Sequence, residues 1–319
     1  NWFNRDLNDM CNSFGSVPLK KIKKLRYGEN PHQKASLYEF GDSKINEISG
    51  KDLSFNNLND LEIAMEVVNE FSDKACAIVK HGNPCGVAIN KKQEIAYQKA
   101  LNCDSTSAFG GIVAFNSKVT EEAAKKISKI FTELVVAPDF SPKALKLMKK
   151  KKNLILVSYK KSKKFKGLKI KTTKNFLLIQ EEDEKKINKR DLVFTTVSKP
   201  TASEIDDMIF AFTICKYLNS NAIVVAKNRA TVGIGVGQTS RVEAAIQAMK
   251  RAKENMKSEK TVLASDGFFP FPDIIKICSK NNIACIIQPG GSKNDQMVIK
   301  AANKSNISMT FTGIRHFKH

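Results

Sequence analysis

The chain has 319 residues, 42% of them hydrophobic and 27% charged, which is the composition of an ordinary soluble globular protein with one large or two medium domains. No apolar run approaches the roughly 20 residues that a membrane-spanning helix needs, and residues 1–14 do not resemble a signal peptide, so we expect a cytoplasmic protein without membrane association. The formal net charge of +21 raises the question of anionic partners.

Lysine accounts for most of the basic residues, and many lysines lie in runs such as 149–152 and 160–164. Such runs are typical of solvated surfaces, and the alternative is that they attract polyanions or anionic substrates. The sequence contains no zinc-finger or RRM signature and no aromatic–glycine run of the kind that binds RNA. Nucleic-acid binding is therefore only a second interpretation.

The seven cysteines are scattered along the chain, and no two form a Cys-x-x-Cys pair. This spacing argues against a secreted disulfide framework and against a zinc ribbon. It indicates a reduced, cytoplasmic protein, and we expect no metal site.

Predicted helices and strands alternate along the chain, as in an α/β fold. Apolar residues recur at helical spacing over residues 61–71, and the short apolar run 75–79 is typical of a buried strand. Thr120, followed by two glutamates, predicts the start of a helix that runs to about Glu133.

Three further helix starts are predicted from capping residues. Ser141 precedes Pro142, a residue that is favoured in the first turn of a helix. Residues 203–206 have a Ser-x-x-Asp pattern, and residues 240–243 have the Ser-x-x-Glu pattern of a capping box before an apolar-periodic segment.

Two stretches, one from Ala75 and one from Asn221, repeat the same order of features. Each has an apolar strand, a turn with lysine, a strand with glycine, a helix, an aspartate before a phenylalanine, and a strand that ends in proline. This recurrence predicts an internal duplication with two α/β units, each with its own core, and a boundary in the charged segment 181–203. The corresponding residues are Lys80 and Lys227, Gly86 and Gly233, Asp104 and Asp266, Phe109 and Phe268, and Pro138 and Pro289.

The segment Lys80–Gly86 (KHGNPCG) follows the first copy's strand directly, where α/β proteins commonly hold ligands. Its lysine and histidine form a workable acid–base pair, and the alternative is a structural turn with a solvated lysine and a capping histidine. Zinc deaminases carry His-x-Glu and Pro-Cys-x-x-Cys motifs. Here Asn83 replaces the glutamate and Cys85 has no second cysteine, so we expect no zinc.

Two segments of the second copy are candidate ligand sites. Residues 233–238 (GIGVGQ) lack the third glycine of a dinucleotide fingerprint, but they lead to Arg241 in the first turn of a helix, which suits an anion or a structural turn. Residues 265–273 (SDGFFPFPD) are typical of an apolar corner or of a slot for a flat heterocycle. The C-terminal residues 315–319 are, by themselves, typical of a frayed basic tail.

Together these segments resemble the AICAR transformylase domain of the bifunctional AICAR transformylase/IMP cyclohydrolase family. The resemblance covers nearly the whole chain from about residue 20, and its most specific motifs are RYGENPHQ at 26–33, KHGNPCG at 80–86 and SDGFFPFPD at 265–273. The resemblance implies two tandem cytidine-deaminase-like α/β subdomains from an internal duplication, without the zinc site.

The family resemblance also sets the expected domain limits. We expect a lead segment at residues 1–19, a first transformylase subdomain at 20–198 and a second at 199–319. Members of the family carry an additional N-terminal cyclohydrolase domain, which is missing here, and a chain that begins at Asn1 fits a fragment of a longer protein.

The resemblance implies a phosphoribosylaminoimidazolecarboxamide formyltransferase of IMP biosynthesis. Such an enzyme transfers the formyl group of 10-formyltetrahydrofolate to the amine of 5-aminoimidazole-4-carboxamide ribonucleotide (AICAR). His81 matches the catalytic histidine and would remove the proton of that amine. Lys80 matches the neighbouring lysine, which would stabilise the oxyanion or protonate the departing folate nitrogen, and Asn221 matches an asparagine that orients the reacting groups.

The resemblance further implies two sets of binding residues and a partner subunit. The positions that match nucleotide contacts are Arg26, Tyr27, Asn57, Gly110, Glu133, Phe268, Arg315 and His319. The positions that match folate contacts are Phe109, Arg241, Pro270 and Asp273. Family members form homodimers with active sites across the interface, which we expect here, and some bind a structural potassium ion.

Two alternatives from other functional classes stay open. A non-catalytic nucleotide- or nucleic-acid-binding protein would use the +21 charge and bind unrelated polyanions without turnover. A folate-independent ligase or deaminase on the same fold would share the acid–base turn. Replacing Lys80 or His81 separates binding from catalysis, because only catalysis would collapse.

Overall fold

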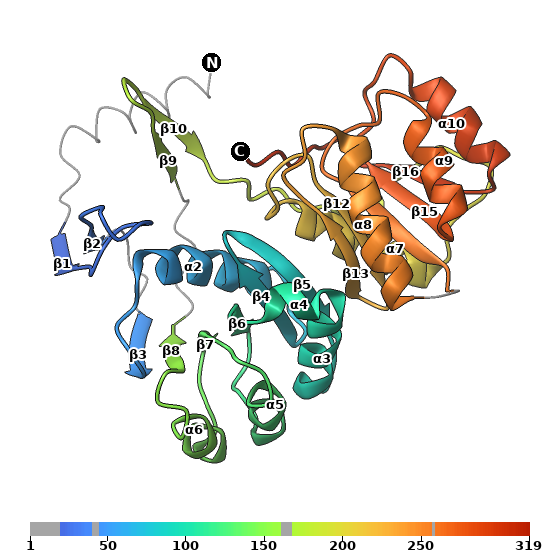
Figure 1. Ribbon diagram of the computed structural model, residues 1–319. Coiled ribbons are helices and arrows are strands. Elements are labelled where there is room, and N and C mark those ends of the chain that lie inside the picture. The colour runs from blue at the N-terminus through green and yellow to red at the C-terminus, as the bar shows by residue number, and fades with distance from the viewer. Residues whose placement is uncertain (1–19, 40–44, 161–167, 257–258) are drawn as a thin grey trace.

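The computed structural model describes residues 20–39, 45–160, 168–256 and 259–319. Within these ranges a 12-stranded mixed sheet lies between two layers of helices (Figure 1). This arrangement confirms the predicted α/β class. The expected lead segment 1–19 and part of the lysine run 160–164 lie outside the described residues.

The first half of the large sheet comes from residues before 160. Its strands are β3 (Ile45–Ser49), β4 (Ala75–Lys80), β5 (Asn83–Ile89), β6 (Ile112–Phe115), β7 (Leu134–Ala137) and β8 (Ile155–Tyr159). Its helices are α2 (Phe55–Asn69), α3 (Gln93–Cys103), α4 (Ser105–Ala108), α5 (Glu121–Ile127) and α6 (Pro142–Met148). The strands lie in the order β5–β4–β6–β7–β8–β3.

The second half begins after a linker with a short 3-10 turn, η2 (Lys189–Asp191). Its strands are β11 (Val193–Phe194), β12 (Ile223–Lys227), β13 (Ala230–Gly235), β14 (Thr261–Ser265), β15 (Ile283–Gln288) and β16 (Ser308–Phe311). Its helices are α7 (Ala202–Cys215), α8 (Arg241–Asn255), α9 (Asp273–Lys280) and α10 (Asp295–Lys304). The strands lie in the order β13–β12–β14–β15–β16–β11.

The two halves have one strand order and one set of strand directions. In each, an antiparallel hairpin (β4–β5 or β12–β13) is followed by an antiparallel neighbour, two parallel strands and an antiparallel edge strand. Strands β5 and β13 pair antiparallel at Ala88 and Ala230, and Val87 N donates to Thr231 Oγ1 over 2.9 Å at the same junction. The halves therefore form one continuous sheet.

One hydrophobic core is shared by both halves. Helices α2 and α7 cover one face of the sheet, and buried residues from both, such as Val68 and Phe212, belong to the same core. On the opposite face the cores are separate, one around Phe115 under α3, α5 and α6, and one around Phe269 under α8, α9 and α10. The expectation that each half has its own core is wrong for the α2/α7 face, because the β5–β13 junction brings these two helices over adjoining strands.

The predicted strand at 75–79 and two of the predicted helix starts are confirmed. Ala75–Val79 is buried throughout, because helices cover both faces of the sheet, and this burial explains its continuous apolar character. The side chains of Thr120 and Ser141 accept hydrogen bonds from the third residues of α5 and α6.

Helix limits differ from prediction at three places, and one predicted capping bond is absent. Helix α5 ends at Ile127 rather than near Glu133, because the following turn brings Phe131 O to Gly110 N. Helix α2 begins at Phe55, six residues before the predicted apolar segment, because Ser54 forms a capping box with Asn57. Helix α7 begins at Ala202, before the predicted Ser-x-x-Asp start at 203–206, because Thr201 and Glu204 form a capping box. Helix α8 begins after Ser240 as predicted, but the side chain of Ser240 makes no capping hydrogen bond.

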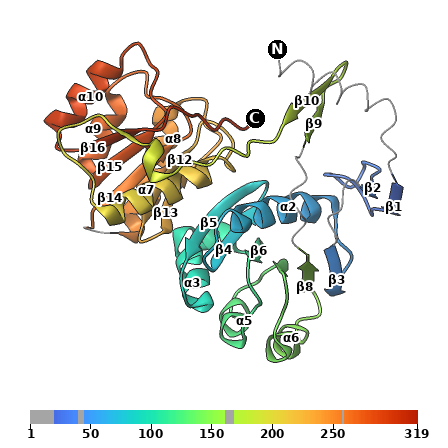
Figure 2. The ribbon, with the colours of Figure 1, turned by 180° about the vertical axis from the view of Figure 1, so that it is seen from behind.

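Two small hairpins lie outside the large sheet. They pair β1 (Lys20–Lys24) with β2 (Ser36–Glu39), and β9 (Leu168–Thr172) with β10 (Leu177–Glu181). Both views show the β9–β10 hairpin standing away from the helical layers (Figures 1 and 2). In this hairpin Phe176 is 71% exposed and Leu177 is 55% exposed. Exposed apolar surface of this kind often contacts another chain. None of the helices described is both long and apolar enough to span a membrane.

Candidate active site

The turn between β4 and β5 carries the predicted acid–base pair. Lys80 and Asn83 are the last paired residues of β4 and β5, so that His81 and Gly82 form a two-residue turn. Their φ angles are 51° and 74°, as a type I′ hairpin turn requires at both central positions. Glycine adopts this left-handed conformation without penalty, whereas histidine does so at a steric cost.

A carboxylate from helix α2 holds this turn in place. Asp60 Oδ2 accepts a hydrogen bond from His81 N at 3.0 Å, and Asp60 Oδ1 accepts one from Gly82 N at 2.6 Å. Both backbone donors of the turn are thereby satisfied by one side chain. Asp60 is not among the predicted site residues. The two halves nevertheless share a signal for it, because the helix that precedes each lysine-bearing turn has an aspartate at its sixth position.

A cavity of about 300 Å³ opens between the two halves at this turn. Lys80 and His81 line it from the first half, and its far wall comes from β13 and α8 of the second half. Lys80 Nζ donates to Phe109 O at 2.6 Å, which joins the turn to the segment before β6. The lining residues are Lys80, His81, Asn83, Pro84, Cys85, Asp104, Ser107, Ile234, Val236, Gln247 and Arg251.

The thiol of Cys85 in this cavity is not a nucleophile at neutral pH. Burial, with a further contribution from the negative charge of Asp104, raises the pKa of Cys85 to about 12. Because the thiolate is the reactive form, the protonated side chain is inert.

Asn221 lies on the loop that faces this turn from the second half. Its Nδ2 donates to Gln238 O at 2.9 Å and to Thr239 O at 3.2 Å, so the side chain is fixed against the loop before α8. Two residues earlier, Asn219 N donates to Asn83 Oδ1 at 3.2 Å. The structure thus connects the loop of Asn221 directly to the turn of Lys80 and His81.

Arg241 forms a buried ion pair at the start of α8. Its Nη1 bonds to Asp266 Oδ1 and, at 3.0 Å, to Ser265 Oγ, while the other carboxylate oxygen accepts from Ser220 Oγ at 2.6 Å. The side chain of Asp266 is fully buried and that of Arg241 is 10% exposed. The predicted folate residue therefore already serves as a structural counter-ion.

The C-terminal residues pack against the same cluster. Lys318 N donates to Ser220 Oγ at 3.2 Å, and Ser220 N donates to Lys318 O at 2.9 Å. Arg315 lies over the ring of Phe317, with its guanidinium carbon 4.8 Å from the ring centre, and the ring of His319 lies 5.9 Å from the same ring. The tail is thus part of the wall next to Asn221 and is not the frayed end that its composition alone indicates.

Three further predicted residues lie near Lys80 through the Phe109 segment. Phe109 is 56% exposed and packs on Phe131 with ring centres 5.3 Å apart. Gly110 has a φ of 72° and donates its N–H to Phe131 O at 2.9 Å. Glu133 forms an ion pair of 2.7 Å with Lys51. This group is therefore joined to the acid–base turn by the bond between Lys80 and Phe109.

The predicted residues before α2 form a second group in the first half. Arg26 donates to Tyr27 Oη at 2.9 Å and lies over its ring. Asn56 Nδ2 donates to Glu29 O at 3.2 Å and ties this loop to the start of α2, where Asn57 caps the helix. Since α2 also carries Asp60, the bond from Asn56 ties the loop of Arg26 and Tyr27 to the helix that supports the His81 turn.

The corner before α9 holds the remaining predicted residues, Phe268, Pro270 and Asp273. Phe268 is 40% exposed, Pro270 O accepts a hydrogen bond of 2.7 Å from Asn294 Nδ2, and Asp273 begins α9. In the described ranges no hydrogen bond or ion pair joins Pro270 or Asp273 to the His81 turn. The start of this segment is instead tied to the loop of Asn221, because Asp266 accepts a hydrogen bond of 2.6 Å from Ser220 Oγ.

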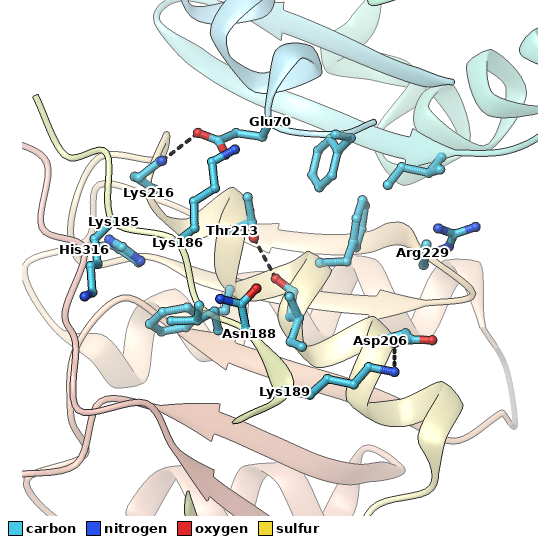
Figure 3. A pocket seen from close by; sticks show the side chains of 16 residues that line it. Glu70, Lys185, Lys186, Asn188, Lys189, Asp206, Thr213, Lys216, Arg229 and His316 are labelled. Carbon is cyan, nitrogen blue, oxygen red and sulfur yellow. Dashed lines mark hydrogen bonds and ion pairs between the residues drawn. The ribbon is translucent and has the colours of Figure 1, made fainter. Parts of the chain in front are cut away.

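A larger cavity of about 420 Å³ lies where α2, the linker after β10 and α7 meet (Figure 3). Glu70 at its rim is bound by Lys186 at 2.8 Å, by Lys216 at 2.6 Å and by Tyr217 Oη at 2.6 Å. Burial by itself would raise the pKa of Glu70, but these three hydrogen bonds outweigh it and lower the pKa to about 2. Glu70 therefore links both halves and the linker through one ionised carboxylate.

The stability of the fold should depend on pH through Glu70. A carboxyl whose pKa falls from 4.5 to about 2 on folding contributes its full stability above pH 4.5 and loses it as the pH falls towards 2. We expect Glu70→Gln to lower the free energy of unfolding at pH 7 by on the order of 3 kcal/mol. Urea unfolding of both proteins at pH 7 and at pH 3 measures this. If the difference in free energy of unfolding between wild type and Glu70→Gln is as large at pH 3 as at pH 7, the proposed link between stability and the ionisation of Glu70 is wrong.

Comparison with known proteins gives consistent matches over this chain. The family model described as AICARFT/IMPCHase bienzyme matches residues 1–251. The bifunctional purine biosynthesis protein PurH of Thermoanaerobacter sp. (strain X514) is 48% identical over 94% of this chain and 59% of its own length. PurH of Clostridium acetobutylicum is 49% identical over 98% of this chain and 62% of its own length.

A relative with lower sequence identity also matches the whole chain. PurH of Bradyrhizobium diazoefficiens is 44% identical over 100% of this chain and 64% of its own length. The chain thus spans about three fifths of the length of the curated relatives that it matches. Since the family model covers most of the chain, the protein belongs to the AICARFT/IMPCHase bienzyme family.

Proposed function

We propose that this chain acts in purine biosynthesis as a formyltransferase that converts AICAR and 10-formyltetrahydrofolate to formyl-AICAR and tetrahydrofolate. The observation that carries the proposal is the pair Lys80 and His81 on a strained turn at a cavity between the two halves. Strained backbone at a cleft is typical of functional sites. The similarity to PurH, a bifunctional purine biosynthesis protein, supports the pathway.

The proposed chemistry needs one base and one acid. The AICAR amine attacks the formyl carbon of the folate while His81 accepts the proton of the amine. Lys80, whose ammonium already donates to a carbonyl oxygen, stabilises the oxyanion of the tetrahedral intermediate and gives a proton to the leaving folate nitrogen. The C–N bond to the folate then breaks, and the formyl group stays on the AICAR nitrogen. Asn221 orients the reacting groups.

Substrate binding is proposed for the residues that match the family. Arg26, Tyr27 and Arg315 are cationic or hydroxyl groups suited to the phosphate of AICAR, and exposed Phe109 offers a ring face for a pterin. Arg241 uses Nη1 for Asp266, so that a folate carboxylate would bind the remaining donors of its guanidinium. The other proposed contacts are Asn57, Gly110, Glu133, Phe268 and His319 for the nucleotide, and Pro270 and Asp273 for the folate.

A homodimer with shared active sites is part of this proposal. The exposed phenylalanine and leucines of the β9–β10 hairpin offer apolar surface for such contact.

We also propose descent from a duplicated cytidine-deaminase-like unit, which the repeated strand order supports, and a cytoplasmic location. Structural potassium stays an expectation from the resemblance.

The test is turnover by the purified chain, with AICAR and 10-formyltetrahydrofolate supplied in potassium buffer and tetrahydrofolate release followed. We expect turnover that requires both substrates and that falls at least 100-fold in a Lys80→Met variant, which keeps an unbranched side chain one atom shorter and removes its charge. No turnover from a folded dimer would contradict the proposal. Tight, salt-sensitive binding of unrelated polyanions by that inactive protein would favour the non-catalytic alternative.

A further inference from the structure

The two halves build the turn of their first hairpin in the same way. Between Lys227 and Ala230, residues Asn228 and Arg229 both have a φ of 50° and form a two-residue turn like that of His81 and Gly82. Asp207 of α7 accepts a hydrogen bond from Asn228 N at 2.8 Å and from Arg229 N at 2.6 Å. In the second half Asp207 thus makes the same pair of hydrogen bonds to its turn that Asp60 makes to the first turn.

The match extends to atoms and spacing. In each half Oδ2 of the aspartate accepts from the first residue of the turn and Oδ1 accepts from the second. In each half 21 residues separate the aspartate from the first residue of the turn. The aspartates stand on α2 and α7, the two helices of the shared core, so that each turn is attached to a rigid element.

The two turns differ in what they carry. The first presents His81 next to Lys80 at a cavity, and its histidine occupies a backbone conformation that is unfavourable for most side chains. The second has Asn228, a residue that tolerates this conformation, and its Arg229 pairs with Asp73 at 2.5 Å. The carboxylate of Asp60 stabilises the turn through its two backbone bonds. Because the imidazole of His81 is attached to this backbone, the same bonds fix the position from which the imidazole projects.

We propose that Asp60 is a positioning residue for His81 and that Asp207 is its structural counterpart without a part in catalysis. This inference rests on the proposed function, because it takes His81 to be the base. A base must lie within hydrogen-bond reach of the proton that it removes, and a displacement of about 1 Å can cost 100-fold in rate. Asp60 acts by fixing the backbone that bears the base, without itself touching the substrate.

The matched experiment compares Asp60→Asn with Asp207→Asn. An asparagine presents one oxygen and one NH₂ group, so in either turn one backbone N–H faces a donor and loses its partner. We expect similar losses of melting temperature in both variants. We expect kcat to fall 10- to 100-fold in Asp60→Asn alone, with KM for AICAR and for the folate within twofold of wild type, and kcat to stay within twofold in Asp207→Asn. Equal losses of kcat in both variants would overturn the proposal.

A double-mutant cycle with His81→Asn tests whether Asp60 acts through the histidine. We expect Asp60→Asn to change kcat by less than twofold in the His81→Asn background, because the group that it positions is then absent. Additive losses would overturn the positioning role. Wild-type kcat in Asp60→Asn beside an inactive His81→Asn would overturn this inference alone. Wild-type kcat in His81→Asn would overturn the proposed base and this inference together.

Discussion

Replacing His81 with asparagine should lower kcat for formyl transfer about 100- to 10,000-fold, the range that is typical for loss of a general base. The variant is chosen because the turn of the second half already has Asn228 at the equivalent position, with a φ of 50° against 51° for His81. Asparagine tolerates this left-handed backbone, so the imidazole is removed while the turn is kept. Steady-state kinetics with both substrates and the melting temperature are measured together.

The reciprocal change provides the control. Asn228→His places an imidazole in the equivalent turn of the second half, away from the Lys80 cavity, and we expect wild-type kcat from it. A loss of kcat in His81→Asn that is matched by a loss of the folded state would assign the effect to stability. A folded His81→Asn protein with wild-type kcat would show that another group is the base.

The second large effect concerns stability. Asp266→Asn should lower the free energy of unfolding by about 3 kcal/mol or more, because it leaves the guanidinium of Arg241 buried without a counter-ion. Asparagine has the shape of aspartate, so the loss comes from charge rather than from a cavity. The same residue anchors Ser220, whose neighbours are Asn221 in sequence and Lys318 in space. We therefore expect kcat to fall as well.

The exposed ion pair of Arg229 and Asp73 is the matched control. The side chains of this pair are 43% and 57% exposed, so water screens the interaction. We expect Asp73→Asn to lower the free energy of unfolding by less than about 1 kcal/mol. Urea unfolding at pH 7 with and without 0.5 M NaCl distinguishes the pairs, since only the exposed pair is sensitive to salt. Equal losses in the two variants would contradict this account of Asp266.

The turn of Lys80 and His81 could be located from sequence because its residues are adjacent along the chain. The turn of Lys80 and His81 follows a strand whose continuous apolar run is readable in any α/β protein. Arg241 was placed in the first turn of a helix by the glycine-rich segment before it, and the structure begins α8 there. Asp60 was missed because its partners are 21 and 22 residues away, and the recurrence of an aspartate at the sixth position of α2 and α7 is visible only once the limits of both helices are known.

The sequence by itself determined the alternation of elements, the capped starts of α5 and α6, and the recurrence of one order of features in two halves. These properties depend on local backbone preferences and on periodicity, which a single stretch of chain contains. Only the tertiary structure decided that the halves share a sheet and a core, that Asn219 bonds to Asn83, and that Lys318 bonds to Ser220. Contacts of this kind join residues far apart in sequence, so they exist only once the β5–β13 pairing has set the two halves against each other.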